Sequence, residues 1–198
     1  EANGGTVKVI TVGDANADPV IRKALAIGAD SAVRINKSAT DSYTTALEIS
    51  NYIKENPADL IIAGKESLDY NGGAVPAMIA EMLQLPLVNA CLGLEIDNGN
   101  AKLSREIDGG KEILSASLPL VIGGQKGLVQ ESELRIPNMR GIMQARTKPL
   151  QVIEPSSTEE LTSSISFEKP PEKESCKLVD AGNVAELVSL LHNEAKVI

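Results

Sequence analysis

The chain has 198 residues, of which 42% are hydrophobic and only 2% aromatic, and its formal net charge at pH 7 is −8. This hydrophobic content is enough for a buried core, so global disorder is excluded. The excess of acidic residues and the scarcity of aromatic rings argue against a nucleic-acid partner. Proteins that bind nucleic acids usually have clustered Lys and Arg and aromatic side chains on which bases stack. Apolar runs are too short to span a bilayer, so we do not expect an integral membrane protein.

Histidine and cysteine are too sparse for the commonest catalytic and metal sites. His192 is the single histidine, and Cys91 and Cys176 stand far apart with no second cysteine nearby. A histidine-based triad, a zinc site and a disulfide framework are therefore not expected. Two isolated thiols indicate a reducing, intracellular compartment.

The first third of the chain alternates short apolar strands with helices. Helices are predicted at 18–27, with Asp18 as N-cap before Pro19, at 41–55 and at 74–84. Strands are predicted at 6–12, 31–35 and 59–63. This alternation with short loops is typical of an α/β fold with a doubly wound, mostly parallel sheet. Such a sheet usually has a leading strand and helix before the one at 6–12, so an N-terminal βα segment is interpreted as missing.

Turn signals from residue 87 onward change the pattern. Short alternating segments over 87–123 predict an antiparallel meander, and a helix over 138–146 and a strand over 149–153 complete a nucleotide-binding domain of residues 1–153. The Ser-, Glu-, Lys- and Pro-rich residues 154–179 predict an extended arm. Residues 180–198 predict a C-terminal helix, which packs either on its own domain or on another subunit.

A glycine-rich segment from Gly64 to Val75 is the most suggestive local feature. It follows a predicted buried strand and opens a helix. Gly72 and Gly73 allow a ligand to approach the backbone, and free N–H groups at a helix start attract an anion. A phosphate site and a plain strand-to-helix loop both fit, because the segment is neither a Walker A motif nor GxGxxG.

Two further segments predict exposed surfaces. Residues 105–112 (REIDGGKE) alternate charged and apolar side chains around a Gly-Gly turn, which fits a solvated hairpin or a charged partner surface. Residues 135–143 (RIPNMRGIM) place Met139 in a turn, where it fits either a core position or an adaptable contact surface. No nucleophile–base pair or carboxylate pair stands out.

Together these segments resemble the β subunit of electron transfer flavoprotein over essentially the whole chain. The resemblance rests on VKVITVG, IRKALAIGAD, DLIIAGKESLD, REIDGGKE leading into LPLVI, LRIPNMRGIMQAR and LLHNEAKVI. It implies an adenine-nucleotide-binding type of α/β fold with a C-terminal arm. It also implies a heterodimer with an α subunit that holds most of the redox FAD.

The resemblance further implies a carrier of electrons rather than an enzyme. Flavin dehydrogenases such as acyl-CoA dehydrogenases supply the electrons, and a quinone reductase or another acceptor takes them. The expected location is the cytoplasm of a bacterium, or the mitochondrial matrix in a eukaryote. The β subunit itself is expected to hold AMP or, in the electron-bifurcating branch, a second FAD.

The family's nucleotide site carries over onto this chain by position. The phosphate cradle falls on the backbone of Gly73, Ala74 and Val75, Ser67 falls near the adenine or ribose, and Ala17 falls beside the nucleotide. Many family members have polar residues where this chain has Gly73-Ala74-Val75. Side-chain contacts to the phosphate are therefore lost while amide contacts remain, which favours AMP or a similar adenine nucleotide but leaves FAD open.

Two residues carry over as contacts to partner proteins. Glu106 stands where the family has a carboxylate that pairs with an arginine of the mobile flavin domain. Met139 stands where the family has an apolar anchor, usually Leu, that docks into a dehydrogenase.

Two other classes of protein remain as alternatives. A stand-alone adenine-nucleotide-binding regulator of the universal-stress type has a similar α/β core, but the segment 87–123 and the C-terminal arm count against it. A small transferase or hydrolase has little support, because the chain lacks a visible nucleophile–base pair.

Overall fold

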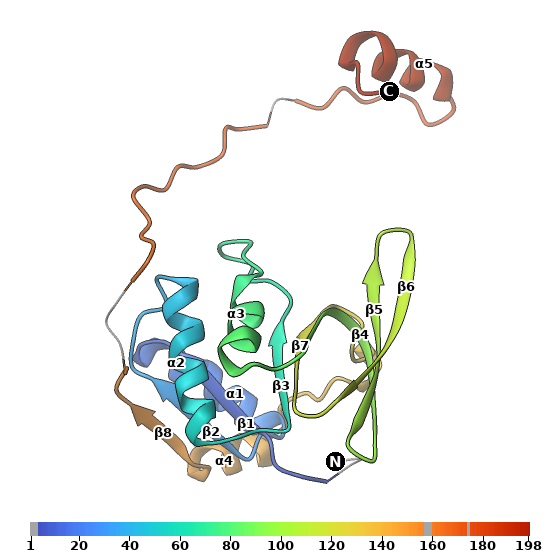
Figure 1. Cartoon of the computed structure of the whole chain (residues 1–198). Helices are drawn as coiled ribbons and strands as arrows, with labels where there is room; N and C mark the ends of the chain where they lie inside the picture. Colours follow the sequence, from blue (N-terminus) through green and yellow to red (C-terminus); the bar gives the residue numbers. More distant parts are fainter. Residues whose placement is uncertain (1–3, 157–159, 174) are drawn as a thin grey trace. The chain divides into compact units, whose positions relative to one another are not determined.

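The computed structural model describes residues 4–156, 160–173 and 175–198 (Figure 1). The chain divides into two compact units, Glu1–Ser164 and Ile165–Ile198. The strands all lie in the first unit, in two separate sheets. A mixed α/β fold with a parallel and an antiparallel part, as predicted, is confirmed.

The first sheet is parallel and has the order β1-β2-β8. Its strands are β1 (Lys8–Val12), β2 (Ser31–Ile35) and β8 (Leu150–Ile153). Helices α1 (Asp18–Ile27) and α4 (Met139–Thr147) pack on each other beside it. The core here is formed by Ile21, Leu25, Ala29, Ala32 and Ala145.

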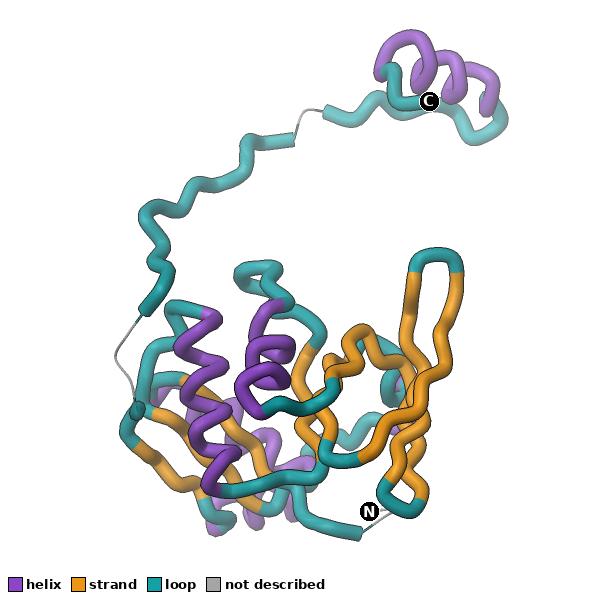
Figure 2. The backbone as a smooth tube through the Cα atoms, in the orientation of Figure 1, coloured by secondary structure: helices purple, strands orange, loops and turns teal. Residues whose placement is uncertain are grey.

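The second sheet is mixed and has the order β3-β7-β4-β5-β6. Its strands are β3 (Leu60–Gly64), β7 (Leu120–Gly124), β4 (Leu87–Asp97), β5 (Asn100–Ile107) and β6 (Gly110–Ser117). The first three run parallel to one another, and β4, β5 and β6 form an antiparallel ladder. Figure 2 shows this ladder as two long hairpins at one end of the unit.

The position of β7 differs from the sequence prediction. The meander expected over 87–123 is confirmed for β4, β5 and β6, but β7 inserts between β3 and β4 and runs parallel to both. Its residues 120–123 are all buried. A continuous apolar strand of this kind belongs inside a parallel sheet, whereas the half-exposed alternation of β6 belongs to an antiparallel one.

Helices α2 (Ser42–Glu55) and α3 (Ala74–Leu83) pack on each other, and α3 also contacts β7. Asp41 caps α2, since its carboxylate accepts a hydrogen bond of 2.6 Å from the Tyr43 amide. The sequence predicted Asp18 as the N-cap of α1, and this prediction is wrong. Ala17, the last residue of the short 3-10 helix η1 (Ala15–Ala17), holds that position, and Asp18 lies in the first turn of the helix.

The described residues of the second unit are helical near the C-terminus. Helix α5 (Val184–Ser189) continues into the π-helical turn η3 (Leu190–Ala195), and the Asn183 side chain caps its start by accepting a hydrogen bond from the Glu186 amide. No helix in the described ranges has both the length and the apolar character needed to cross a membrane.

Candidate functional site

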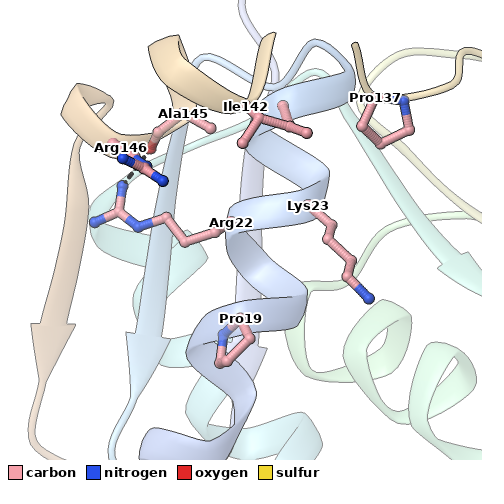
Figure 3. A pocket seen from close by; sticks show the side chains of 8 residues that line it. Pro19, Arg22, Lys23, Pro137, Ile142, Ala145 and Arg146 are labelled. Carbon is pink, nitrogen blue, oxygen red and sulfur yellow. Dashed lines mark hydrogen bonds between the residues drawn. The ribbon is translucent and has the colours of Figure 1, made fainter. Parts of the chain in front are cut away.

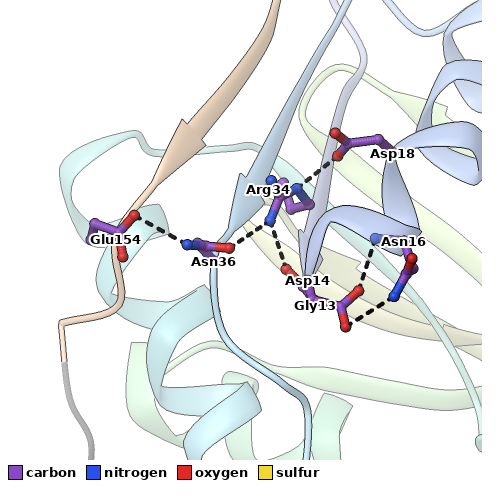
Figure 4. Close-up of polar contacts among 7 residues, drawn as sticks. All are labelled: Gly13, Asp14, Asn16, Asp18, Arg34, Asn36 and Glu154. Atoms are coloured by element: carbon purple, nitrogen blue, oxygen red, sulfur yellow. Dashed lines mark hydrogen bonds and ion pairs between the residues drawn. The ribbon is translucent and has the colours of Figure 1, made fainter.

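The loop after β1 is held by a buried arginine from the neighbouring strand. Arg34 on β2 is 5% exposed, and its Nε donates to Asp18 Oδ1 at 2.7 Å. Its Nη1 donates to the Gly13 carbonyl at 3.0 Å and to Asn36 Oδ1 at 2.9 Å (Figure 4). One guanidinium therefore ties the ends of β1 and β2 to the start of α1.

The same network extends across the carboxyl ends of the first sheet. Asn36 Nδ2 donates to Glu154 Oε1 at 3.2 Å, which links β2 to the segment after β8 (Figure 4). Asp14 accepts from the Asn16 amide at 2.8 Å and so closes the turn that leads to Ala17. Carboxyl ends of parallel strands are where open α/β sheets bind ligands. The predicted nucleotide contact Ala17 therefore lies at the edge of the sheet where a ligand is expected.

The glycine-rich segment forms a closed loop between β3 and α3. The Ser67 amide donates to the Gly72 carbonyl at 2.9 Å, and the Gly72 amide approaches Ser67 Oγ at 3.4 Å. The Ser67 hydroxyl and the Tyr70 amide bind the Asp69 carboxylate and hold its pKa below the usual value. These contacts bring the predicted residue Ser67 next to the start of α3.

Helix α3 begins without a capping side chain. Gly73 is its N-cap and has no side chain to bind the orphan amides, and Ala74 and Val75 follow as its first residues. A Cβ atom at Gly73 would lie 3.1 Å from the Lys65 carbonyl oxygen, so this position favours glycine. The first amides of α3 are thus free of a side-chain cap and available to an anion.

The structure places the predicted nucleotide contacts in two groups. Ser67, Gly73, Ala74 and Val75 belong to one loop and helix start, whereas Ala17 ends the short helix η1 that follows β1 of the first sheet. Within the described residues, no hydrogen bond joins Ala17 to that loop. Both groups follow the carboxyl ends of parallel strands.

Glu106 lies near the end of β5, where the β5–β6 hairpin begins. It is exposed, faces Lys111 across the hairpin and binds the Gln125 side-chain amide. The neighbouring Arg105 forms an ion pair of 2.6 Å with Glu112. Glu106 is therefore presented on a charged strand pair rather than buried in a core.

Met139 is the first residue of α4 and is 75% exposed. The Asn138 side chain caps this helix by accepting a hydrogen bond of 2.8 Å from the Gly141 amide. The core position considered for Met139 is thereby wrong, and the side chain is available to another molecule.

Sequence reasoning missed Arg34 and Gln125 as parts of these sites. An arginine within the apolar strand SAVRI is a signal that could have identified Arg34, since a buried charge needs partners. Gln125 shows no comparable signal, because only the strand order brings it beside Glu106. Across the described ranges, no cluster of three His, Cys, Asp or Glu side chains could hold a metal ion.

The chain is similar to known proteins along its length. A family model described as the electron transfer flavoprotein domain matches residues 1–158. The electron transfer flavoprotein subunit beta of Bacillus subtilis is 36% identical over 212 residues, which cover 100% of this chain and 81% of that protein. The subunit beta of Syntrophomonas wolfei is 34% identical, over 96% of this chain and 76% of that protein.

A shorter match adds to these. The electron transfer flavoprotein subunit beta of Mycobacterium tuberculosis is 38% identical over 153 residues, which cover 75% of this chain and 56% of that protein. The family model and the two long matches span nearly all the elements described above. The chain therefore belongs to the electron transfer flavoprotein domain family.

Proposed function

We propose that this chain is the β subunit of an electron transfer flavoprotein heterodimer and a carrier of electrons in the cytoplasm. Its α subunit holds most of the redox FAD. Flavin dehydrogenases such as acyl-CoA dehydrogenases reduce the complex, and a quinone reductase or another acceptor oxidises it. Family membership supports this proposal, and the exposed Met139 and Glu106 supply surfaces for the dehydrogenase and for the α subunit respectively.

The observation that carries the nucleotide-binding part of the proposal is the uncapped start of α3. Free amides at residues 73–75 and the positive end of the helix dipole suit a phosphate. Gly73 has no side chain that could compete with a ligand for these amides. The hydrogen bond from the Gly72 amide to Ser67 Oγ holds Ser67 beside the start of α3, which supports Ser67 as a contact to the ribose or adenine.

AMP or a similar adenine nucleotide fits this loop better than a group that needs charged side chains. Ala74 and Val75 offer only backbone amides, and a single phosphate is satisfied by a few such donors. A second FAD in this subunit remains the alternative occupant. The redox FAD supplies the one- and two-electron chemistry, and this chain binds and orients partners around it.

The experiment is a reduction assay on the complex of this chain with its flavin-containing subunit. Adding an acyl-CoA dehydrogenase and its acyl-CoA substrate should bleach the visible flavin absorbance of the complex. The dehydrogenase alone in catalytic amount is the control. A stable yellow complex that no flavin dehydrogenase reduces would contradict the carrier function.

A further inference from the structure

A cavity of about 660 Å³ lies between α1 and α4, apart from the proposed nucleotide site (Figure 3). Pro19, Ala26, Pro137, Ile142 and Ala145 give the cavity a largely apolar lining, and the two helices approach closely beside it. A Cβ atom at Gly141 would lie 2.5 Å from the Ala26 carbonyl oxygen, so glycine is needed where α4 crosses α1. The lining comprises Pro19, Arg22, Lys23, Ala26, Pro137, Ile142, Ala145 and Arg146.

Three cations form part of this lining. Arg22 Nη1 donates at 2.7 Å to the carbonyls of Ala145 and Lys148 and so fastens α1 to the end of α4. Lys23 and Arg146 are exposed, and neither forms an ion pair or hydrogen bond with any described residue. Two unpaired cations beside one apolar cavity attract a group that carries negative charge.

Neither of the two segments that line the cavity, 19–26 and 137–146, contains an Asp or Glu. Residues 134–148 carry four Lys or Arg and no Asp or Glu, although the chain as a whole has a net charge of −8. The one carboxylate on α1, Asp18, is bound to Arg34. This face is therefore basic although the protein as a whole is acidic. A basic face of this kind is complementary in charge to an acidic surface of a partner protein.

Exposed apolar side chains continue this surface beyond the cavity. Ile136, Met139 and Met143 are 83%, 75% and 65% exposed, and Pro137 between them lines the cavity itself. The cavity and the proposed dehydrogenase anchor Met139 therefore share one segment of chain. Met139, Ile142 and Arg146 are spaced at i, i+3 and i+7 on α4 and share one helix face, so a partner that covers Met139 lies beside two residues of the cavity lining.

We propose that the α1–α4 cavity receives an apolar side chain of the dehydrogenase that docks at Met139, and that carboxylates beside this side chain pair with Lys23 and Arg146. The inference rests on the proposed function and adds a reciprocal contact to it, with each protein inserting an apolar group into the other. A protein side chain suits the site better than a membrane, because a flat lipid surface leaves a concave cavity unfilled. Charge pairs at such a rim raise association rates and depend on salt.

The test compares two charge-reversed forms of the complex of this chain with its flavin-containing subunit. One carries Lys23→Glu and Arg146→Glu, and the matched control carries Lys54→Glu and Lys102→Glu, exposed cations on α2 and β5 with the same change in net charge. The second-order rate of flavin reduction by an acyl-CoA dehydrogenase is measured at low and high ionic strength. At low salt we expect the second-order rate constant to fall roughly tenfold for Lys23→Glu with Arg146→Glu and to change little for the control pair. At high salt the difference between the two pairs should become smaller, because salt screens the charges.

A second pair of variants tests the apolar part of the cavity. Ile142→Asn changes the lining without changing charge, and Ile113→Asn on β6, at another exposed isoleucine, is its control. Ile142→Asn should slow reduction at every ionic strength, and Ile113→Asn should not. Circular dichroism and thermal melting of each complex confirm that the variants are folded.

Several outcomes would overturn this inference. If both charge-reversed pairs slow flavin reduction by the same factor, the effect comes from net charge and not from the cavity. If Met139→Ala slows reduction but the cavity variants do not, the cavity proposal fails and the proposed function stands. If none of these variants slows reduction, docking through this whole face fails. The complex is also tested for binding to phosphatidylglycerol vesicles. If Lys23→Glu with Arg146→Glu abolishes that binding and leaves the rate of flavin reduction unchanged, the face binds a membrane and the inference is overturned.

Discussion

Asp41 shows at the scale of single residues how one carboxylate joins distant parts of the chain. It is 4% exposed, caps α2 and accepts hydrogen bonds of 2.5 and 2.8 Å from the amides of Leu161 and Thr162. Burial alone would raise its pKa, but the amides of Thr162, Tyr43 and Leu161 hold the pKa below the usual value. The ionised form is therefore the one that stabilises the fold.

The pH dependence of stability tests this role. Because the pKa of Asp41 is lower in the folded state, its contribution is complete above the unfolded pKa of about 3.9 and is lost as pH falls through the folded value. Asp41→Ala should reduce the free energy of unfolding at pH 7 by about 2 kcal/mol, from the lost cap and amide bonds. Asp41→Asn keeps a capping oxygen without the charge.

Urea unfolding at several pH values measures both effects. The difference between the unchanged chain and Asp41→Asn should shrink as pH falls below about 4. A difference that stays constant from pH 7 to pH 3 would show that the ionised carboxylate is not the stabilising form.

Met139 makes a prediction about electron transfer rather than stability. Truncating an exposed apolar anchor removes about 1–2 kcal/mol of binding, or roughly tenfold in affinity. Met139→Ala should therefore slow reduction of the complex by its dehydrogenase while the flavin spectrum stays unchanged. Ile113→Ala, at an exposed apolar residue of β6 outside this face, is a control. Unchanged donor kinetics for Met139→Ala would remove Met139 from the docking surface.

The role of Asp18 could be predicted only in part from the sequence. Asp18 and Pro19 have the pattern of a helix start, and α1 does begin at Asp18. The role of Asp18 as partner of Arg34 depends on a strand that follows sixteen residues later, which no local pattern reveals. Local preferences predicted the boundary, and tertiary packing decided what the side chain binds.

The start of α3 gives a prediction at the scale of an element. Ala74→Asp places a negative charge where the phosphate is proposed to bind, and acidic residues in a first helical turn stabilise the helix by about 0.3–1 kcal/mol. The nucleotide content of the purified complex should fall, while the nucleotide-free chain melts at the same or a higher temperature. Opposite effects on binding and on stability distinguish loss of an anion site from loss of the fold.

Ala74→Asn is the matched control for this variant. It has nearly the same shape as aspartate but no charge, so the nucleotide should remain bound. Equal nucleotide content in both variants and in the unchanged complex would exclude a phosphate at the start of α3.

The positions of the strands were predictable from this sequence, but their order and the direction of β7 were not. The four strands predicted at 6–12, 31–35, 59–63 and 149–153 and the hairpins predicted within 87–123 lie close to their expected places, because such signals are local. The sequence did not show that β3 pairs with β7 in a sheet separate from β1 and β2, or that β7 lies between β3 and β4. Pairing between strands some sixty residues apart is set by packing of the whole unit.

Glu106 gives a prediction about the motion of the whole heterodimer. It is exposed on the β5–β6 hairpin and is proposed to pair with an arginine on the mobile flavin domain of the α subunit. Glu106→Ala should change how often that domain leaves the β subunit, with little effect on stability, since exposed substitutions usually stay within about 0.5 kcal/mol. Small-angle scattering of the complex measures the change.

Glu95→Ala, on the same sheet at an exposed position of β4, serves as the control for scattering. It should leave the profile unchanged. An identical profile and transfer rate for Glu106→Ala would mean that Glu106 does not hold the flavin domain.

The nucleotide content of the intact complex shows whether this chain is a nucleotide-binding subunit of a flavoprotein. This chain is purified with its flavin-containing subunit, the complex is denatured, and the released nucleotides are separated by chromatography. We expect one FAD and one AMP per heterodimer. Two FAD and no AMP would contradict the AMP assignment, and a chain that purifies alone with no flavin would contradict the proposal that it is an electron-carrying subunit.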